Sequence, residues 1–173
     1  TEYAFHGGSW LTFAEIIEQV KSHNTPYVCV TGGEPLAQKR VYKLLDQLVD
    51  AGFIVSLETA GSISVAKVNP AVYKVIDMKA PGSAECEKND YKNLALLNNK
   101  DQVKFVIADE IDYQWAKKLI AEHDLPQQCQ ILMSPVAGEL SPTTLADWIL
   151  KDQLPVRFQI QLHKLLWGDT PGT

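Results

Sequence analysis

The chain has 173 residues, of which 46% are apolar and 21% charged, which is typical of one globular domain with a substantial core. Its 16 basic and 21 acidic residues give a net charge of −5, which disfavours a surface for nucleic acid or for an anionic membrane. No apolar run reaches the roughly 18 residues that span a bilayer, and no signal-peptide pattern is present, so we expect a cytoplasmic protein without a membrane partner.

The first predicted element is an amphipathic helix that begins after Thr12, because Thr12 and Glu15 have the spacing of a capping box. A second helix is predicted between residues 38 and 52, with Gly52 placed where a C-terminal cap belongs. Each helix carries an apolar stripe, formed by Phe13, Ile16, Ile17 and Val20 in the first and by Val41, Leu44, Leu45, Leu48 and Val49 in the second.

Two further helices are predicted in the second half of the chain. Asp112 is expected to be the N-cap of one, and Ser141 the N-cap of the other, with Pro142 at its first helical position. The region 80–101 is polar and irregular, and we expect a long loop there with one short helix.

Strands are predicted where β-branched runs alternate with these helices. Several runs are almost continuously apolar, which favours parallel strands covered on both faces. Repeated strand–helix units predict an α/β fold with a mostly parallel sheet. The six runs are 26–31, 53–59, 72–78, 102–108, 128–134 and 156–162.

The three cysteines are Cys29, Cys86 and Cys129. They are far apart in the sequence, so neither a disulfide framework nor a CxxC metal site is indicated. Cys29 lies inside an apolar run, and we expect it to be a thiol of the core.

Polar residues and glycines follow the predicted strands. Examples are "TGGEP" at 31–35, "ETAGS" at 58–62 and "DMKAPGS" at 77–83, and "SPV" at 134–136 and "QLHK" at 161–164 lie at later strand ends. Because ligands of parallel βα folds bind at the carboxyl ends of the strands, this pattern predicts a small-molecule site.

The string "TGGEP" carries the most chemistry. Gly32 and Gly33 let the backbone approach a ligand closely, and the carboxylate of Glu34 is suited to an ammonium group. The alternative is an ordinary tight turn with a solvated glutamate. The position of the string, directly after a strand and before an amphipathic helix, favours the site.

"TGGEP" within βα repeats resembles the radical S-adenosylmethionine (SAM) superfamily, whose GGE motif binds the amino group of SAM. The opening "TEYAF" and the later "QLHK" resemble the 7-carboxy-7-deazaguanine synthase family. The resemblance extends over essentially all 173 residues and implies a partial (βα) barrel of radical SAM type, built as a single domain over 1–173.

The resemblance implies a ring-contracting carbon–nitrogen lyase of queuosine biosynthesis. Such an enzyme converts 6-carboxy-5,6,7,8-tetrahydropterin to 7-carboxy-7-deazaguanine with loss of ammonia. The implied cofactors are SAM, a [4Fe–4S] cluster and Mg²⁺, and the implied partners are the pterin substrate, an electron donor such as flavodoxin, and a second copy of the chain in a homodimer.

Site residues follow from the same resemblance. Thr1 matches the family's Mg²⁺ ligand, and Thr31 and His163 match substrate-binding positions. The positions expected to bind SAM are Gly32, Gly33, Glu34, Glu58, Thr59, Lys79 and Ser134. For three of these residues a structural role is the alternative: Lys79 as a solvated loop cation, His163 as a satisfied histidine and Ser134 as the start of a turn.

The chain departs from the family pattern at the cluster. The family's three cluster cysteines precede the residue matched by Thr1, and no such triad occurs in these 173 residues. The economical explanation is that the sequence starts just after the third cysteine and lacks the first βα unit. A glycyl-radical-enzyme activase and a SAM- or nucleotide-binding βα domain without radical chemistry stay open as alternatives.

Overall fold

A computed structural model describes residues 9–168, apart from the side chain of His163. Within this part, six parallel strands pair in sequential order, from β1 to β6. The strands are β1 (Tyr27–Val30), β2 (Ile54–Thr59), β3 (Tyr73–Met78), β4 (Gln102–Ile107), β5 (Gln130–Pro135) and β6 (Arg157–Phe158).

The strands alternate with helices. The α-helices are α1 (Phe13–Ser22), α2 (Val41–Asp50), α3 (Glu110–Glu122), α4 (Pro142–Lys151) and α5 (Leu162–Trp167). Short 3₁₀ turns are η2 (Pro35–Ala37), η3 (Val65–Lys67), η4 (Pro81–Ser83), η5 (Cys86–Lys88), η6 (Tyr91–Leu96) and η7 (Leu125–Gln127). None of the helices in residues 9–168 is both long and apolar enough to cross a membrane.

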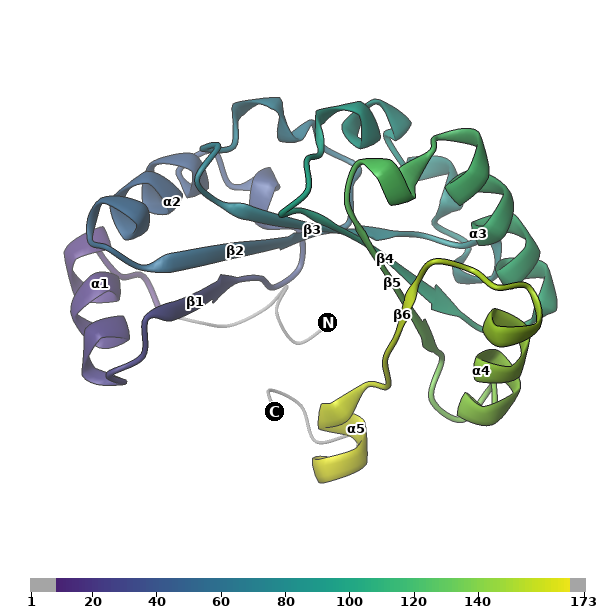
Figure 1. Ribbon diagram of the computed structural model, residues 1–173. Coiled ribbons are helices and arrows are strands. Elements are labelled where there is room, and N and C mark those ends of the chain that lie inside the picture. The colour runs from purple at the N-terminus through teal and green to yellow at the C-terminus, as the bar shows by residue number, and fades with distance from the viewer. Residues whose placement is uncertain (1–8, 169–173) are drawn as a thin grey trace.

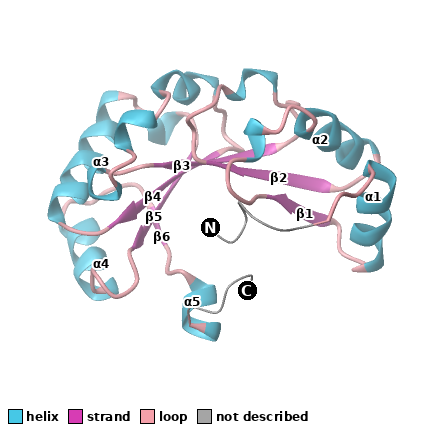
Figure 2. Ribbon diagram, turned by 180° about the vertical axis from the view of Figure 1, so that it is seen from behind, coloured by secondary structure: helices cyan, strands magenta, loops and turns pink. Residues whose placement is uncertain are grey.

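The sheet bends into an arch, with α1 to α4 along its outer side and an open concave side (Figure 1; Figure 2). Sequential parallel strands joined by crossovers of one hand place all their helices on the same face, as in a (βα) barrel. The predicted α/β fold with a parallel sheet is therefore confirmed, and its shape is that of a barrel that does not close within residues 9–168.

The two faces of the sheet differ, because buried and more accessible residues alternate along β2, β3 and β4. The convex face carries the core and packs against the helices, with Leu57, Ile76 and Phe105 fully buried. The concave face carries polar residues such as Glu58 and Lys104. The expectation that both faces are covered holds for β5, where Ile131 to Pro135 are all buried, and is wrong for β2, β3 and β4, where the open barrel leaves the inner face accessible.

The same geometry corrects the expectation for Cys29. This residue is exposed, because β1 is an edge strand of the described sheet and alternate residues of β1 point to the accessible side. Cys129 is instead the thiol that belongs to the core, at 8% exposure.

Two of the three predicted helix starts and the predicted end of α2 follow the sequence signals. The capping box of Thr12 and Glu15 is present, Gly52 follows α2 with φ +88°, and Ser141 precedes α4. Asp112 is not the N-cap of α3. Asp109 has that position and accepts from the Asp112 amide at 2.9 Å, because the Asp112 carboxylate accepts instead from two amides of neighbouring loops.

The predicted strand 156–162 is also wrong in extent. Strand β6 has two residues, and the chain then turns into α5. The Gln159 amide still bonds to the Met133 carbonyl at 3.0 Å, after which pairing to β5 ends. The Leu- and Lys-containing segment that follows has good helix propensity, and it forms a helix on the open side of the arch (Figure 1).

The region 80–101 forms three short 3₁₀ turns, where one short helix was predicted. Its fully buried Asn93 anchors the loop after β2. The Asn93 side chain accepts from the Val65 amide at 2.9 Å and donates to the carbonyls of Gly61 and Ile63, both at 3.0 Å. One amide side chain therefore satisfies three backbone groups that lie outside any strand pairing.

Replacing Asn93 with Leu should lower the free energy of unfolding by about 3 kcal/mol, because unsatisfied buried polar groups cost about 1–3 kcal/mol each. Urea denaturation measures the change. The same substitution at the exposed Asn99 is the control, and it should stay within about 0.5 kcal/mol of the parent. Equal effects at the two positions would show that the Asn93 contacts contribute nothing.

The thiols should also react in a defined order. Burial raises the pKa of Cys129 to about 11, so at pH 8 only about a thousandth of it is thiolate. The pKa of Cys29 is raised too, chiefly by partial desolvation, but its thiol is exposed. Iodoacetamide in the folded protein, followed by peptide mass spectrometry, should label Cys29 well before Cys129. The reverse order would contradict the placement of these two residues.

Candidate functional site

A small pocket of about 100 Å³ lies where the loops after β1, β2 and β3 meet the concave face of the sheet. Parallel strands bring their carboxyl ends to one edge, so residues from four strands and their loops converge here. The lining residues are Thr31, Gly32, Gly33, Glu58, Thr59, Ala60, Val75, Asp77, Lys79 and Lys104.

The loop after β1 has a backbone that requires glycine. Gly32 has φ +104° and Gly33 has φ +24°, so both lie in the left-handed region that L-residues rarely adopt. A second, wider cavity of about 630 Å³ lies on the other side of this turn, towards α1 and α2. Thr31, Gly32 and Gly33 line both cavities, so the diglycine turn is accessible from two sides, and the wider cavity has the volume of a ligand pocket.

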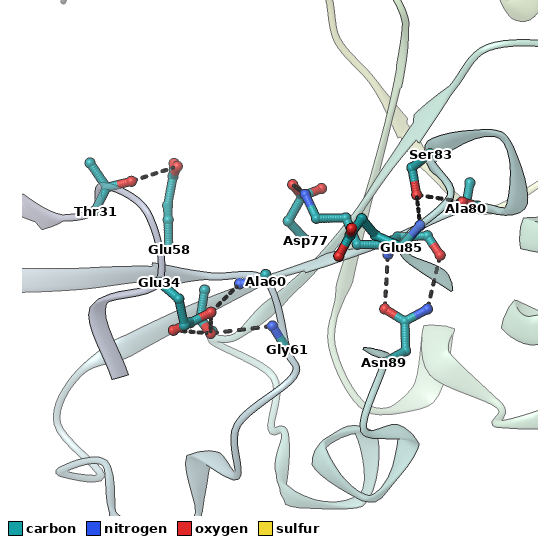
Figure 3. Close-up of polar contacts among 12 residues, drawn as sticks. Thr31, Glu34, Glu58, Ala60, Gly61, Asp77, Ala80, Ser83, Glu85 and Asn89 are labelled. Carbon is teal, nitrogen blue, oxygen red and sulfur yellow. Dashed lines mark hydrogen bonds and ion pairs between the residues drawn. The ribbon is translucent and has the colours of Figure 1, made fainter. Parts of the chain in front are cut away.

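Glu34 joins the loop after β1 to the end of β2 (Figure 3). Its carboxylate accepts from the Leu36 amide at 3.0 Å, which caps η2, and from the Ala60 amide at 2.8 Å. The Thr59 hydroxyl donates to the same carboxylate, at 2.8 Å from the nearer oxygen. Glu34 is therefore occupied by donors of the protein itself, and its position is fixed to both loops.

Charged side chains on the inner face surround the pocket. Lys79 forms an ion pair with Asp77 at 2.6 Å, and Thr31 donates to Glu58 over a long 3.4 Å contact (Figure 3). Lys104 lies opposite Asp77 in the β3–β4 register. The pocket thus combines two carboxylates with two ammonium groups.

Asn89 fixes the backbone of Lys79. Its side chain accepts from the Lys79 amide at 3.0 Å and donates to the Lys79 carbonyl at 2.9 Å. Further along the same loop, the Asp112 carboxylate accepts from the Gly82 amide at 2.8 Å and from the Ala108 amide at 3.1 Å, which ties the loop after β3 to the loop after β4. These contacts hold the pocket rim in place.

Most predicted ligand residues come together in this structure. Glu34 borders the wider cavity beside them, whereas Ser134 lines neither cavity. Ser134 is fully buried in β5, and its hydroxyl is the one buried side-chain polar atom without a partner in residues 9–168. The residues that line the small pocket as expected are Thr31, Gly32, Gly33, Glu58, Thr59 and Lys79.

Two predicted positions lie partly or wholly outside the described residues. His163 lies in α5, beyond β6 rather than at the end of a long strand, and its side chain is outside the described residues. Thr1 is outside them altogether.

Asp77, Lys104 and Asn89 were not predicted as site residues, although Asp77 opens the strand-end string "DMKAPGS". Asp77 and Lys104 alternate with buried residues in β3 and β4, and this alternation was the available signal.

The residues that the structure describes do not supply a cluster site. No group of three or more His, Cys, Asp or Glu residues within 9–168 is arranged to hold a metal ion. Cys29, Cys86 and Cys129 lie on β1, in η5 and before β5. The described residues do fit SAM, in contrast to the cluster. The pocket allows a close approach to the backbone at the diglycine turn and carries charges of both signs.

No protein-family model matches the chain. A 7-carboxy-7-deazaguanine synthase from Chlorobaculum tepidum is 45% identical over 171 residues, which cover 97% of this chain and 78% of the relative. The corresponding protein of Koribacter versatilis is 36% identical over 188 residues and is matched over 82% of its length.

Solved structures share the fold at low identity. QueE from Escherichia coli has a TM-score of 0.62 and 19% identity, over 87% of this chain and 64% of that one. SuiB of Streptococcus suis, solved with bound S-adenosylmethionine, has a TM-score of 0.62 and 11% identity, over 90% of this chain and 45% of that one.

The fold defines an α/β protein with an open, parallel (βα) barrel, and these solved structures share that architecture. Within that class, the chain belongs to the family of 7-carboxy-7-deazaguanine synthases.

Replacing Glu34 with Ala should destabilise the protein by about 2 kcal/mol, because three donors lose a buried or half-buried acceptor. Thermal and urea unfolding measure the loss. Glu87 is exposed and is a suitable control for the same substitution. If E34A unfolds like E87A, the Glu34 contacts do not hold the two loops together.

Proposed function

We propose that the protein is a carbon–nitrogen lyase that converts 6-carboxy-5,6,7,8-tetrahydropterin to 7-carboxy-7-deazaguanine and ammonia. The observation that supports this most directly is the diglycine turn at a pocket lined by residues of both charges, in a chain 45% identical to a named synthase of this kind. The conversion is redox-neutral overall, and its product and ammonia account for all atoms of the substrate.

SAM and the family's [4Fe–4S] cluster, when bound, supply the radical that starts such a rearrangement. Within residues 9–168 no group of three His, Cys, Asp or Glu residues is placed to hold a metal ion, and the pocket residues bind and orient the organic ligands. The backbone at Gly32 and Gly33 approaches the SAM amino group, and the fixed Glu34 keeps this turn in place.

The remaining pocket residues position the organic ligands. Glu58 and Thr31 face the pocket from β2 and the end of β1, and Lys79 is held at its backbone by Asn89. Ser134 offers an unpaired buried hydroxyl on the neighbouring part of the sheet. His163 is proposed to contact the substrate, as its family position implies.

We also propose that the protein binds Mg²⁺ with Thr1 as a ligand, accepts electrons from an external reductant such as flavodoxin, and forms a homodimer. The three free cysteines fit a reducing cytoplasm, where we place the protein. Residues 1–173 are proposed to act as one domain.

The direct test uses the complete gene product, reconstituted with iron and sulfide without oxygen. Absorption of the thiolate–iron bands reports the cluster, and chromatography reports the deazaguanine product formed with SAM and Mg²⁺. A cluster-bearing protein that forms product supports the proposal. A protein that binds SAM but forms neither cluster nor product is a binding domain without radical chemistry. A cluster-bearing protein that cleaves SAM without converting the pterin would favour the activase.

Gly32→Ala should weaken SAM binding at least tenfold, because a side chain at φ +104° forces the turn to rearrange. Gly138→Ala is a matched control, since Gly138 also has positive φ (+85°) but has no atoms within 4 Å of an added Cβ. Both variants should lose roughly 1–2 kcal/mol of stability from the strained backbone. Calorimetric titration measures the affinity of each variant for SAM. Equal affinities of the Gly32→Ala and Gly138→Ala variants would argue against the turn as the SAM site.

A further inference from the structure

Lys104 is a half-buried cation on the inner face of the sheet. It lies in the middle of β4, between the fully buried Val103 and Phe105, so its side chain points to the concave side. There it lines the pocket together with Asp77 and Lys79. The described part of the chain has no carboxylate within 4 Å of its ammonium group.

The neighbouring acid is already occupied. Asp77 is the register partner of Lys104, but its carboxylate pairs with Lys79 at 2.6 Å. The other carboxylate of the pocket is Glu58, on β2, which accepts a long 3.4 Å hydrogen bond from Thr31 and forms no ion pair within residues 9–168. After these pairings, one negative group remains at the β2 side of the pocket and one positive group at the β4 side.

The distance between the two sides suits a small bipolar ligand. Strands β2 and β4 are separated by two strand spacings of about 4.8 Å, or roughly 10 Å, a span comparable to a bicyclic heterocycle with one substituent. An ammonium group that is partly removed from water and faces a pocket is stabilised most by an anion that enters the pocket. The fixed Asp77–Lys79 pair leaves Lys104 as the cation available for this role.

We infer that Lys104 binds the carboxylate of a ligand in this pocket. The inference rests on the proposed function, in which two ligands carry a carboxylate: the pterin substrate at C6 and SAM at its methionine end. An ammonium group acts on either as a compact point charge. Lys104 is thus a specificity residue, because it favours ligands that present an anion at the β4 side of the pocket.

The test compares Lys104→Gln and Lys104→Arg in the complete, cluster-reconstituted protein. Lys67→Gln, a change of an exposed lysine outside both cavities, is the control. Calorimetry gives separate dissociation constants for the carboxypterin, for the tetrahydropterin without its carboxylate, and for SAM. Circular dichroism and urea unfolding verify that the variants fold.

For K104Q we expect roughly tenfold to hundredfold weaker binding of one carboxylate-bearing ligand, as for the loss of a charge-assisted hydrogen bond. K104R should recover part of the affinity, and K67Q should bind like the parent. A loss confined to the carboxypterin, with the decarboxylated pterin unaffected, identifies the substrate carboxylate as the partner. A loss confined to SAM identifies the methionine carboxylate.

Unchanged affinity of K104Q for both ligands would overturn the inference while leaving the proposed function intact. So would an equal loss for the pterins with and without the carboxylate, because the effect would then not depend on an anion. A parent protein that binds neither ligand would overturn both the inference and the proposed function.

Discussion

The carboxylate of Glu34 is the contact on which the pocket depends most. Loops at the carboxyl end of an open parallel sheet leave backbone donors without strand partners, and these donors need acceptors. Glu34 supplies one acceptor group to the Leu36 amide, the Thr59 hydroxyl and the Ala60 amide. Because the two glycines directly precede Glu34, fixing its side chain also fixes their uncommon backbone conformation. Glu34, which was predicted to bind a ligand, thus also stabilises the diglycine turn that lines the pocket.

Other polar side chains around the rim of the pocket also bond to the backbone of loops. Asn93 anchors the loop after β2, Asn89 anchors the backbone of Lys79 after β3, and Asp112 joins the loops after β3 and β4. Asn93, Asn89 and Asp112 come from later in the chain than the loops that they hold, whereas Glu34 comes from earlier in the chain than the loop after β2. Asn93, Asn89 and Asp112 are buried and Glu34 is half-buried, so their hydrogen bonds form with little competition from water. The rim is therefore rigid by polar contacts, while the outer face of the sheet is held by apolar packing.

The parallel α/β fold could be predicted because strand and helix patterns alternate clearly and the caps of α1 and α4 follow local rules. The length of β6 could not be predicted from the sequence, because strand pairing at the edge of a sheet depends on tertiary contacts. Thr31 was predicted from the family resemblance and Glu58 from the resemblance together with its place at a strand end, and both line the small pocket. Lys104 was not predicted because it lies inside β4, whereas ligand residues were expected after the strand ends, and only the curvature of the sheet decides which face stays open.

The anchoring of loops by side chains from neighbouring units has a consequence for recombination among relatives. In a βα barrel each unit resembles an exchangeable module, but here Glu34 of one unit bonds to Thr59 and Ala60 of the next, and Asp112 reaches back to Gly82. A chimera with a crossover between residues 34 and 59, or between 82 and 112, separates a donor from the acceptor that evolved with it. Crossovers that keep both members of each pair in one parent preserve the rim, so permissible junctions follow these hydrogen bonds rather than the boundaries of helices and strands.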